Sequence, residues 1–115
     1  MAVLNFRRYA RVEVDIPVNC YVNEASQPVA GYLSNISEEG ASLISPSSLP
    51  IAASLEFDII LPRSRDLAHV RADVLWSRPV QEGGARVFAH GVLFSRVGVE
   101  DRERLQAFIN TSMSY

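Results

Sequence analysis

The sequence predicts a mostly β protein: a small barrel or sandwich of antiparallel strands that ends in one α-helix. Three observations support this fold class. Apolar and polar residues alternate with a period of two in several short segments. Turn-forming residues such as Gly, Pro, Asn and Asp separate these segments, and only the last stretch changes to helical spacing. At 115 residues, the chain is long enough for one domain with one core.

The first and longest strand is expected over residues 12–22, where polar and apolar side chains alternate without interruption. Pro17 has no backbone N–H, so this strand either lies at a sheet edge or bends there. Cys20 falls on the apolar face, which favours a buried, unreactive thiol. The apolar face consists of Val12, Val14, Ile16, Val18, Cys20 and Val22.

Further strands are expected along the rest of the chain, with turns between them. Gly83 and Gly84 tolerate positive φ and favour a hairpin there. The strand that follows this hairpin carries apolar residues on both faces, which is typical of a central strand. The expected strands are 29–33, 41–44, 54–61, 70–77 and 86–94, and the expected turns, bends and loops are 24–28, 35–40, 45–50 and 62–66.

A C-terminal helix is expected over about residues 100–111, lying over one mouth of the sheet. Leu105 and Ile109 follow helical spacing. Glu100 and Asp101 lie near the N-terminal end, where the helix dipole favours acidic side chains.

The composition is that of a soluble globular protein, with 48% hydrophobic and 21% charged residues. The formal net charge is -2, which does not favour binding to a nucleic acid polymer. A single Cys excludes an intrachain disulfide. No apolar run reaches the roughly 18 residues that span a bilayer, and the N-terminus lacks a signal peptide. We therefore expect a cytoplasmic protein without membrane insertion, either free-standing or cut from a longer chain.

An arginine cluster precedes the first strand. Arg7, Arg8 and Arg11 lie within five residues, and the chain contains no Lys. A guanidinium group binds phosphate bidentately and also stacks on ring faces. The cluster is either a solvated basic tail or a local anion site. We expect residues 1–11 to form a flexible arm and residues 12–115 to form a single domain.

The polar bend at residues 35–40 carries the second group of candidates. Asn35 and Ser37 can bond to neighbouring backbone groups, and Gly40 permits a left-handed turn or a close backbone approach. Alternatively, Asn35 and Ser37 project polar atoms from the barrel surface beside the arm, where Asn suits a purine edge or a phosphate. Glu38 and Glu39 are expected to point to solvent or to pair with Arg.

Two motifs of this chain together resemble those of the PilZ domain, the bacterial receptor module for cyclic di-GMP. They are RxxxR, from Arg7 to Arg11, and NxSxxG, from Asn35 to Gly40. The family pattern is RxxxR followed by (D/N)xSxxG, and every defining position is filled here. Segments 72–76 and 91–94 and the closing helix also look like later elements of the family. The resemblance therefore covers the whole chain, and the ordered pair of motifs is more specific than either motif alone.

The resemblance implies a split antiparallel β-barrel of six or seven strands with a C-terminal helix. It also implies a non-enzymatic receptor, often with a stacked ligand dimer. Ligand binding would order the arm and change a surface that a downstream protein effector recognises, with motility, adhesion or polysaccharide production as the output. No cofactor is expected besides the ligand. The implied cyclic di-GMP contacts are Arg7, Arg8, Arg11, Asn35, Ser37 and Gly40.

The remaining candidates are weaker. Trp76 is expected either to pack in the core or to form a stacking wall for guanine. His69 and His90 lie far apart without further ligands at metal spacing, so no metal site is expected. No catalytic motif is present, so no enzymatic activity is expected. The alternative function is a protein-interaction module with the PilZ fold that acts independently of the nucleotide.

Overall fold

The computed structural model describes residues 10–113, which form six β-strands and one α-helix. Each strand overlaps a predicted segment, because the period-two pattern places one apolar face on the core. The elements are β1 (Val12–Val22), β2 (Val29–Ile36), β3 (Gly40–Ser45), β4 (Ser54–Ile60), β5 (Leu67–Glu82), β6 (Ala85–Val97) and α1 (Val99–Met113).

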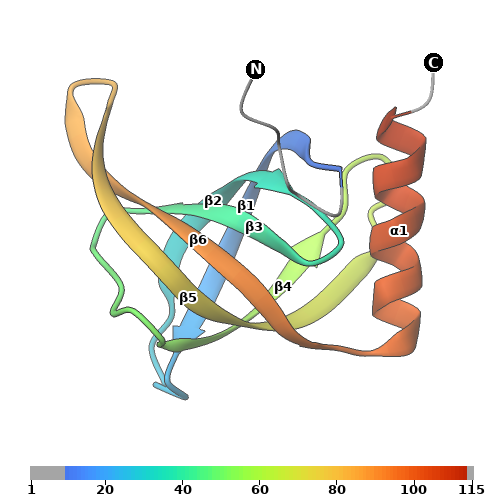
Figure 1. The fold of residues 1–115 in the computed structure, drawn as a ribbon, viewed down its shortest axis with the longest axis horizontal. Coiled ribbons are helices and arrows are strands. Elements are labelled where there is room, and N and C mark those ends of the chain that lie inside the picture. Colours follow the sequence, from blue (N-terminus) through green and yellow to red (C-terminus); the bar gives the residue numbers. More distant parts are fainter. Residues whose placement is uncertain (1–9, 114–115) are drawn as a thin grey trace, which may run out of the picture.

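The six strands form a closed antiparallel barrel in the order β1-β2-β3-β6-β5-β4 (Figure 1). Strand β6 was predicted to be central, but every strand of the closed barrel has two neighbours, which for β6 are β3 and β5. The predicted fold class is confirmed, with a barrel rather than a sandwich and with six strands. Closure places the apolar faces of all six strands around a single core.

The core confirms the predicted alternation. In β1, Ile16, Val18 and Cys20 are buried while the intervening residues are exposed. Burial raises the pKa of the Cys20 thiol to about 12, so the thiol is protonated and unreactive at neutral pH. The largest side chains in the core include Phe57, Leu33, Ile36, Leu43, Leu55, Ile59 and Leu61.

Strand β1 is irregular around Pro17. Its register with β2 shifts between Glu13 and Ile16, and its pairing with β4 is restricted to Tyr21 and Val22. Pro17 therefore lies just after a bulge and on a stretch of β1 that is not paired with β4. Of the two predicted explanations for this proline, the structure supports the irregular strand rather than the sheet edge, because β1 has a neighbour on each side of the closed barrel.

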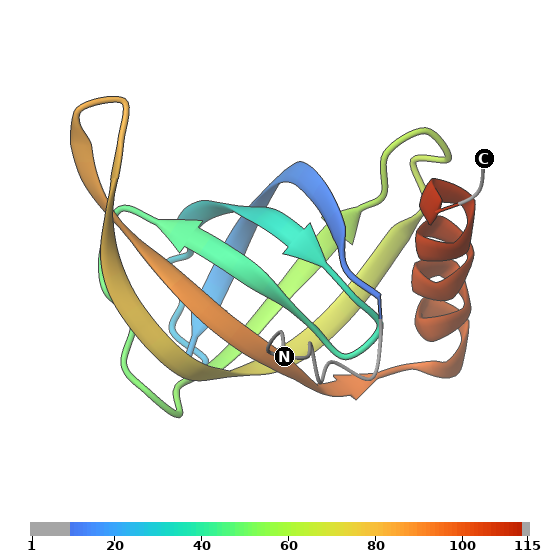
Figure 2. The ribbon, with the colours of Figure 1, turned by 45° about the horizontal axis from the view of Figure 1, so that its top comes forward.

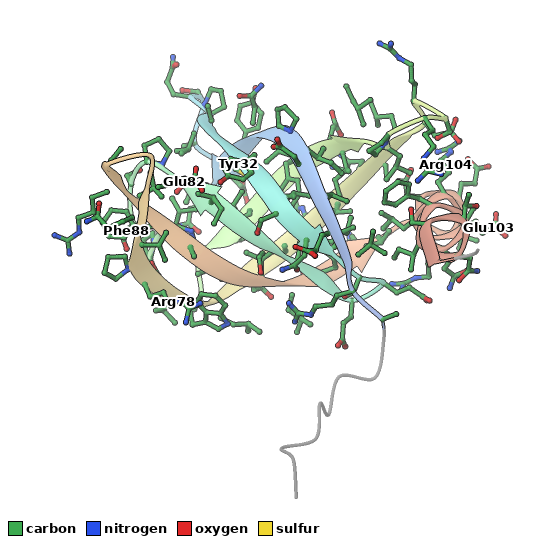
Figure 3. The ribbon with its side chains drawn as sticks, turned by 90° about the horizontal axis from the view of Figure 1, so that it is seen from above. Tyr32, Arg78, Glu82, Phe88, Glu103 and Arg104 are labelled. Atoms are coloured by element: carbon green, nitrogen blue, oxygen red, sulfur yellow. The ribbon has the colours of Figure 1, made fainter. Side chains whose placement is uncertain are left out.

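Strands β5 and β6 are longer than predicted and continue as a two-stranded hairpin beyond the barrel, away from α1 (Figure 1). Gly83 and Gly84 form the turn with φ values of 57° and 81°. Tyr32 of β2 and Glu82 of the hairpin are joined by a hydrogen bond between their side chains, and this bond raises the pKa of Tyr32 to about 12 (Figure 3). This contact ties the end of the hairpin to β2.

Helix α1 covers one end of the barrel, as predicted, and packs against β5 and β1 (Figure 2). It extends one residue before and two residues after the predicted limits. Leu105 and Ile109 are buried on its inner face, while Phe108 is partly buried against the core. No helix within residues 10–113 is both long and apolar enough to cross a membrane.

Candidate functional site

The predicted polar bend is shorter in the structure than in the sequence-based expectation. Asn35 lies within β2, where it pairs with Glu13 of β1 and Ser42 of β3, so its assignment to the bend was wrong. The chain turns only over residues 37–39 before β3 begins at Gly40. Asn35 is therefore fixed between two neighbouring strands, which gives its side chain a defined position.

Ser37 closes this turn. Its hydroxyl oxygen accepts hydrogen bonds from the backbone N–H groups of Glu39 and Gly40 at 3.3 and 3.2 Å, and the hydroxyl lies 3.3 Å from the Gly40 carbonyl oxygen to which it donates. Its backbone N–H also donates to that carbonyl oxygen at 2.8 Å. Ser37 is only 2% exposed. Of the two roles considered for Ser37, hydrogen bonding to neighbouring backbone groups is the one that the structure supports, because its hydroxyl is used inside the turn.

Gly40 is required by a close approach between strands. A Cβ at this position would lie 2.2 Å from the carbonyl oxygen of Val92 in β6. Any larger residue would push β3 away from β6. Of the two roles considered for Gly40, close backbone approach is the one that the structure supports.

Arg11 and Asn35 connect the two sequence motifs. The Arg11 Nη1 group donates to Asn35 Oδ1 at 3.3 Å, and Asn35 Nδ2 donates to Ser42 Oγ at 3.0 Å. Both ends of the Asn35 amide are thus used, with its oxygen directed to the exposed guanidinium group. The structure brings Arg11 and Asn35 together, whereas Arg7 and Arg8 lie outside the described residues.

Trp76 lies on the outer surface of the barrel, so the expectation of core packing was wrong. A register shift between Val74 and Trp76 places Leu75 in a bulge, and both Leu75 and Trp76 then face outward. The Trp76 residue is 40% exposed. The alternative role considered for it, a stacking wall, requires this exposed position.

The Trp76 indole is held against the backbone of the neighbouring strand. Trp76 is the cross-strand partner of Gly91, and a Cβ at position 91 would lie 2.2 Å from the indole nitrogen. The Arg78 guanidinium lies 5.2 Å from the centre of the indole ring, within cation–π range. Sequence reasoning missed Gly91 and Arg78, because this packing depends on the register of β5 with β6.

The Arg11 and Trp76 side chains share one hollow of about 110 Å³ on the barrel surface. Leu75 and Leu93 add exposed apolar area to it, with exposed fractions of 54% and 40%. The site thus combines the Arg11 guanidinium, the Asn35 amide and the Trp76 indole with the apolar side chains of two leucines. Its lining residues are Arg11, Glu39, Gly40, Ala41, Leu75, Trp76, Gly91, Val92 and Leu93.

The two glutamates of the turn are both partly buried, and neither points simply to solvent. Glu38 Oε1 accepts a hydrogen bond of 2.9 Å from Gln106 Nε2 of helix α1. Glu39 lines the hollow, and its carbonyl oxygen accepts a 2.8 Å bond from the N–H of Phe94. The turn beside the candidate site is therefore tied directly to α1 and β6.

The two histidines have different environments. His90 is buried, with Nδ1 donating to the Leu43 carbonyl oxygen at 3.1 Å and Nε2 accepting from the Leu49 N–H at 3.0 Å, and burial lowers its pKa. His69 lies between Asp58 and Glu56, and its hydrogen bond to Asp58 is the main cause of a raised pKa. Among residues 10–113, no group of His, Cys, Asp and Glu is arranged to hold a metal ion.

Comparison with known protein families gives a match to the PilZ domain over residues 5–111. The chain belongs to the PilZ domain family. The match includes both motif segments and extends to the C-terminal helix, so it covers the described barrel of this PilZ domain. A comparison with curated protein sequences gave no match.

Solved structures with this PilZ fold include the PilZ domain of YcgR from Escherichia coli with c-di-GMP, at 16% identity and a TM-score of 0.69, covering 93% of this chain and 91% of that chain. The inhibitor of motility MotI/DgrA of Bacillus subtilis matches at 19% identity and a TM-score of 0.75. The match covers 96% of this chain and 53% of that chain. Apo MrkH of K. pneumonia matches at 14% identity and a TM-score of 0.78. The match covers 97% of this chain and 52% of that chain. This chain spans about half the length of MotI/DgrA and MrkH.

Proposed function

We propose that this PilZ domain is a receptor for cyclic di-GMP. The hydrogen bond between Arg11 and Asn35 carries the proposal, because it joins the two motif segments at one surface site beside Trp76. Family membership and the similarity to the YcgR PilZ domain, which was solved with c-di-GMP, support this ligand. The structure of the MrkH complex with c-di-GMP supports this ligand further. It matches at 13% identity and a TM-score of 0.69, covering 94% of this chain and 52% of that chain.

The chemistry of the site suits a compact dianion with two guanine bases. The Arg11 guanidinium can donate to a phosphate oxygen or to the O6 and N7 edge of guanine. Trp76, Leu75 and Leu93 offer apolar area on which a base can lie. Arg78 adds a second cation over the indole ring. Each part of the ligand thus has a complementary group.

The proposed arm completes the site. In this proposal, residues 1–11, which carry Arg7 and Arg8 and precede β1, close over a body formed by residues 12–115. Ordering the arm costs about 1–2 kcal/mol per backbone residue fixed. Charge-assisted hydrogen bonds of about 1.5–3 kcal/mol each must exceed this cost. Several arginines are therefore needed for tight binding.

The proposed output is mechanical rather than catalytic. Glu38, in the turn beside the site, holds Gln106 of α1, so a ligand that moves this turn also changes the helix surface. A downstream effector, for example in motility, would recognise this altered surface in the cytoplasm. The name of MotI/DgrA, an inhibitor of motility, agrees with such an output for a relative of this fold.

Isothermal titration calorimetry with cyclic di-GMP tests the proposal, using the wild-type chain and the variants Arg11→Ala and Arg71→Ala. Arg71 is also partly exposed but lies on the β4–β5 face beside Glu56, which makes it a matched control. We expect binding by the wild type and Arg71→Ala, and binding at least about tenfold weaker by Arg11→Ala. No binding by the folded wild type would overturn the proposal and favour a nucleotide-independent interaction module.

A further inference from the structure

The barrel wall has a seam between β1 and β4. Strands β1 and β4 pair across it at two positions only, Tyr21 with Glu56 and Val22 with Leu55, although β4 continues to Ile60. Beyond these pairs the wall is hollowed by a groove of about 570 Å³, much larger than the hollow of about 110 Å³ beside Arg11. No residue of the described part of the chain lines both, and on these residues the groove is separate from the proposed nucleotide site.

Exposed apolar side chains from three strands line this groove. Tyr21 of β1, Ile60 of β4 and Leu67 of β5 are 41%, 56% and 47% exposed. Ile60 and Leu67 are cross-strand partners, so their side chains form one continuous apolar surface. Apolar side chains gathered in a surface groove are typical of an interaction site.

The polar part of the groove is acidic and fixed in position. His69 holds Glu56 through Nε2 at 2.7 Å and Asp58 through Nδ1 at 2.6 Å. Arg71 reaches Glu56 at 3.7 Å but is not part of the lining. Among the described residues, the lining contains two carboxylates and one histidine, which leaves net negative charge beside Ile60 and Leu67.

We propose that this seam binds an extended segment of a partner protein in which basic and apolar side chains alternate, with its backbone lying along the open edge of β4. Strand addition uses the side of β4 that β1 leaves unpaired beyond Glu56. Pro17 on the opposite wall has no N–H, so β1 cannot offer a complete ladder there. Alternation follows from the pleat, because Glu56 and Asp58 lie on the outer face of β4 while Phe57 lies on its inner face, so every second side chain of an added strand faces the carboxylates.

A defined peptide tests this proposal by NMR. The probe is an eight-residue peptide of alternating valine and arginine, added to the ¹⁵N-labelled chain at about 150 mM salt. We expect saturable shifts in residues 56–60 and 67–69. The variant Glu56→Gln/Asp58→Asn should bind the peptide about fivefold more weakly.

Two controls keep the result specific. Glu100→Gln/Glu103→Gln removes the same number of charges from exposed positions on α1 and should bind as the wild type does. A valine–glutamate peptide should not bind. The proposal is overturned if the arginine peptide causes no shifts, if the shifts lie elsewhere, or if both double variants bind it equally. A dimer that forms through the seam without any peptide binding would also overturn it.

Discussion

Glu38 and Gln106 are joined by a 2.9 Å hydrogen bond across 68 residues of sequence. This bond links the turn of the NxSxxG motif to helix α1, which covers one end of the barrel (Figure 2). Hydrogen bonds of Ser37 to the backbone of Gly40 close the turn itself. A change at the proposed nucleotide site therefore has a direct physical connection to the helix.

This connection predicts that cyclic di-GMP slows amide hydrogen exchange in α1. We expect an effect of about twofold or more in the wild type, because a ligand that fixes the turn also fixes Gln106. The variant Glu38→Ala should still bind ligand but lose the effect on α1. Glu103→Ala, at an exposed position on the same helix (Figure 3), is the matched control. Equal slowing in Glu38→Ala and the wild type would exclude this route.

The variant Asn35→Ala should weaken binding of cyclic di-GMP by about tenfold or more, because Arg11 loses the acceptor that directs its guanidinium group. Asn35→Asp keeps an oxygen acceptor for Arg11 and should retain much more affinity. Calorimetry on both variants checks this, with circular dichroism to show that the barrel is intact. Equal affinity of Asn35→Ala and the wild type would show that Asn35 does not position Arg11.

Gly91→Ala should displace the Trp76 indole from the sheet without unfolding the barrel. The new methyl group would lie 2.2 Å from the indole nitrogen, and the ring can rotate away because Trp76 faces solvent. We expect a shifted tryptophan emission and binding of cyclic di-GMP about fivefold weaker. Trp76→Leu separates the two causes, since it removes the ring while keeping Gly91. An unchanged emission spectrum in Gly91→Ala would show that the indole does not depend on this glycine.

The two histidines predict that stability is greatest near neutral pH. The pKa of His90 is lowered by burial, so its contribution is present above the ordinary value of about 6.5 and is lost as pH falls below it. The pKa of His69 is raised by Asp58, so its contribution is present below about 6.5 and is lost as pH rises through the raised value. Urea unfolding of the wild type from about pH 5 to pH 9 checks both directions.

The variant His69→Gln isolates the alkaline side of this profile. It should lose the decline in stability above about pH 6.5 while keeping the decline on the acidic side. If His69→Gln declines above neutral pH as the wild type does, the raised pKa of His69 does not contribute to stability.

Local pattern was sufficient to predict that the six strands and the helix exist, but not the full lengths of β2, β5 and β6. The alternation in β1 and the spacing of Leu105 and Ile109 each follow from the side that a residue must bury. The pair of motifs also predicted that the segments of Arg11 and Asn35 meet, and the structure brings these two residues together.

The prediction of side-chain direction was wrong where strand pairing interrupted the alternation of apolar and polar residues. Core packing was one of the two roles predicted for Trp76, but the bulge at Leu75 turns the Trp76 side chain outward. Asn35 was predicted in a bend, yet its pairing with β1 and β3 extends β2 through it. The contact between Glu38 and Gln106 had no local signal, since it depends on how α1 docks on the barrel.

The most direct test of the central claim is an NMR titration of the ¹⁵N-labelled chain with cyclic di-GMP. We predict that the largest shifts occur at the Asn35 side-chain amide, the Gly40 amide and the Trp76 indole N–H, with little change at His69 on the β1–β4 seam. Shifts confined to the seam, or no shifts with saturating ligand, would contradict the claim that this face of the barrel binds the nucleotide.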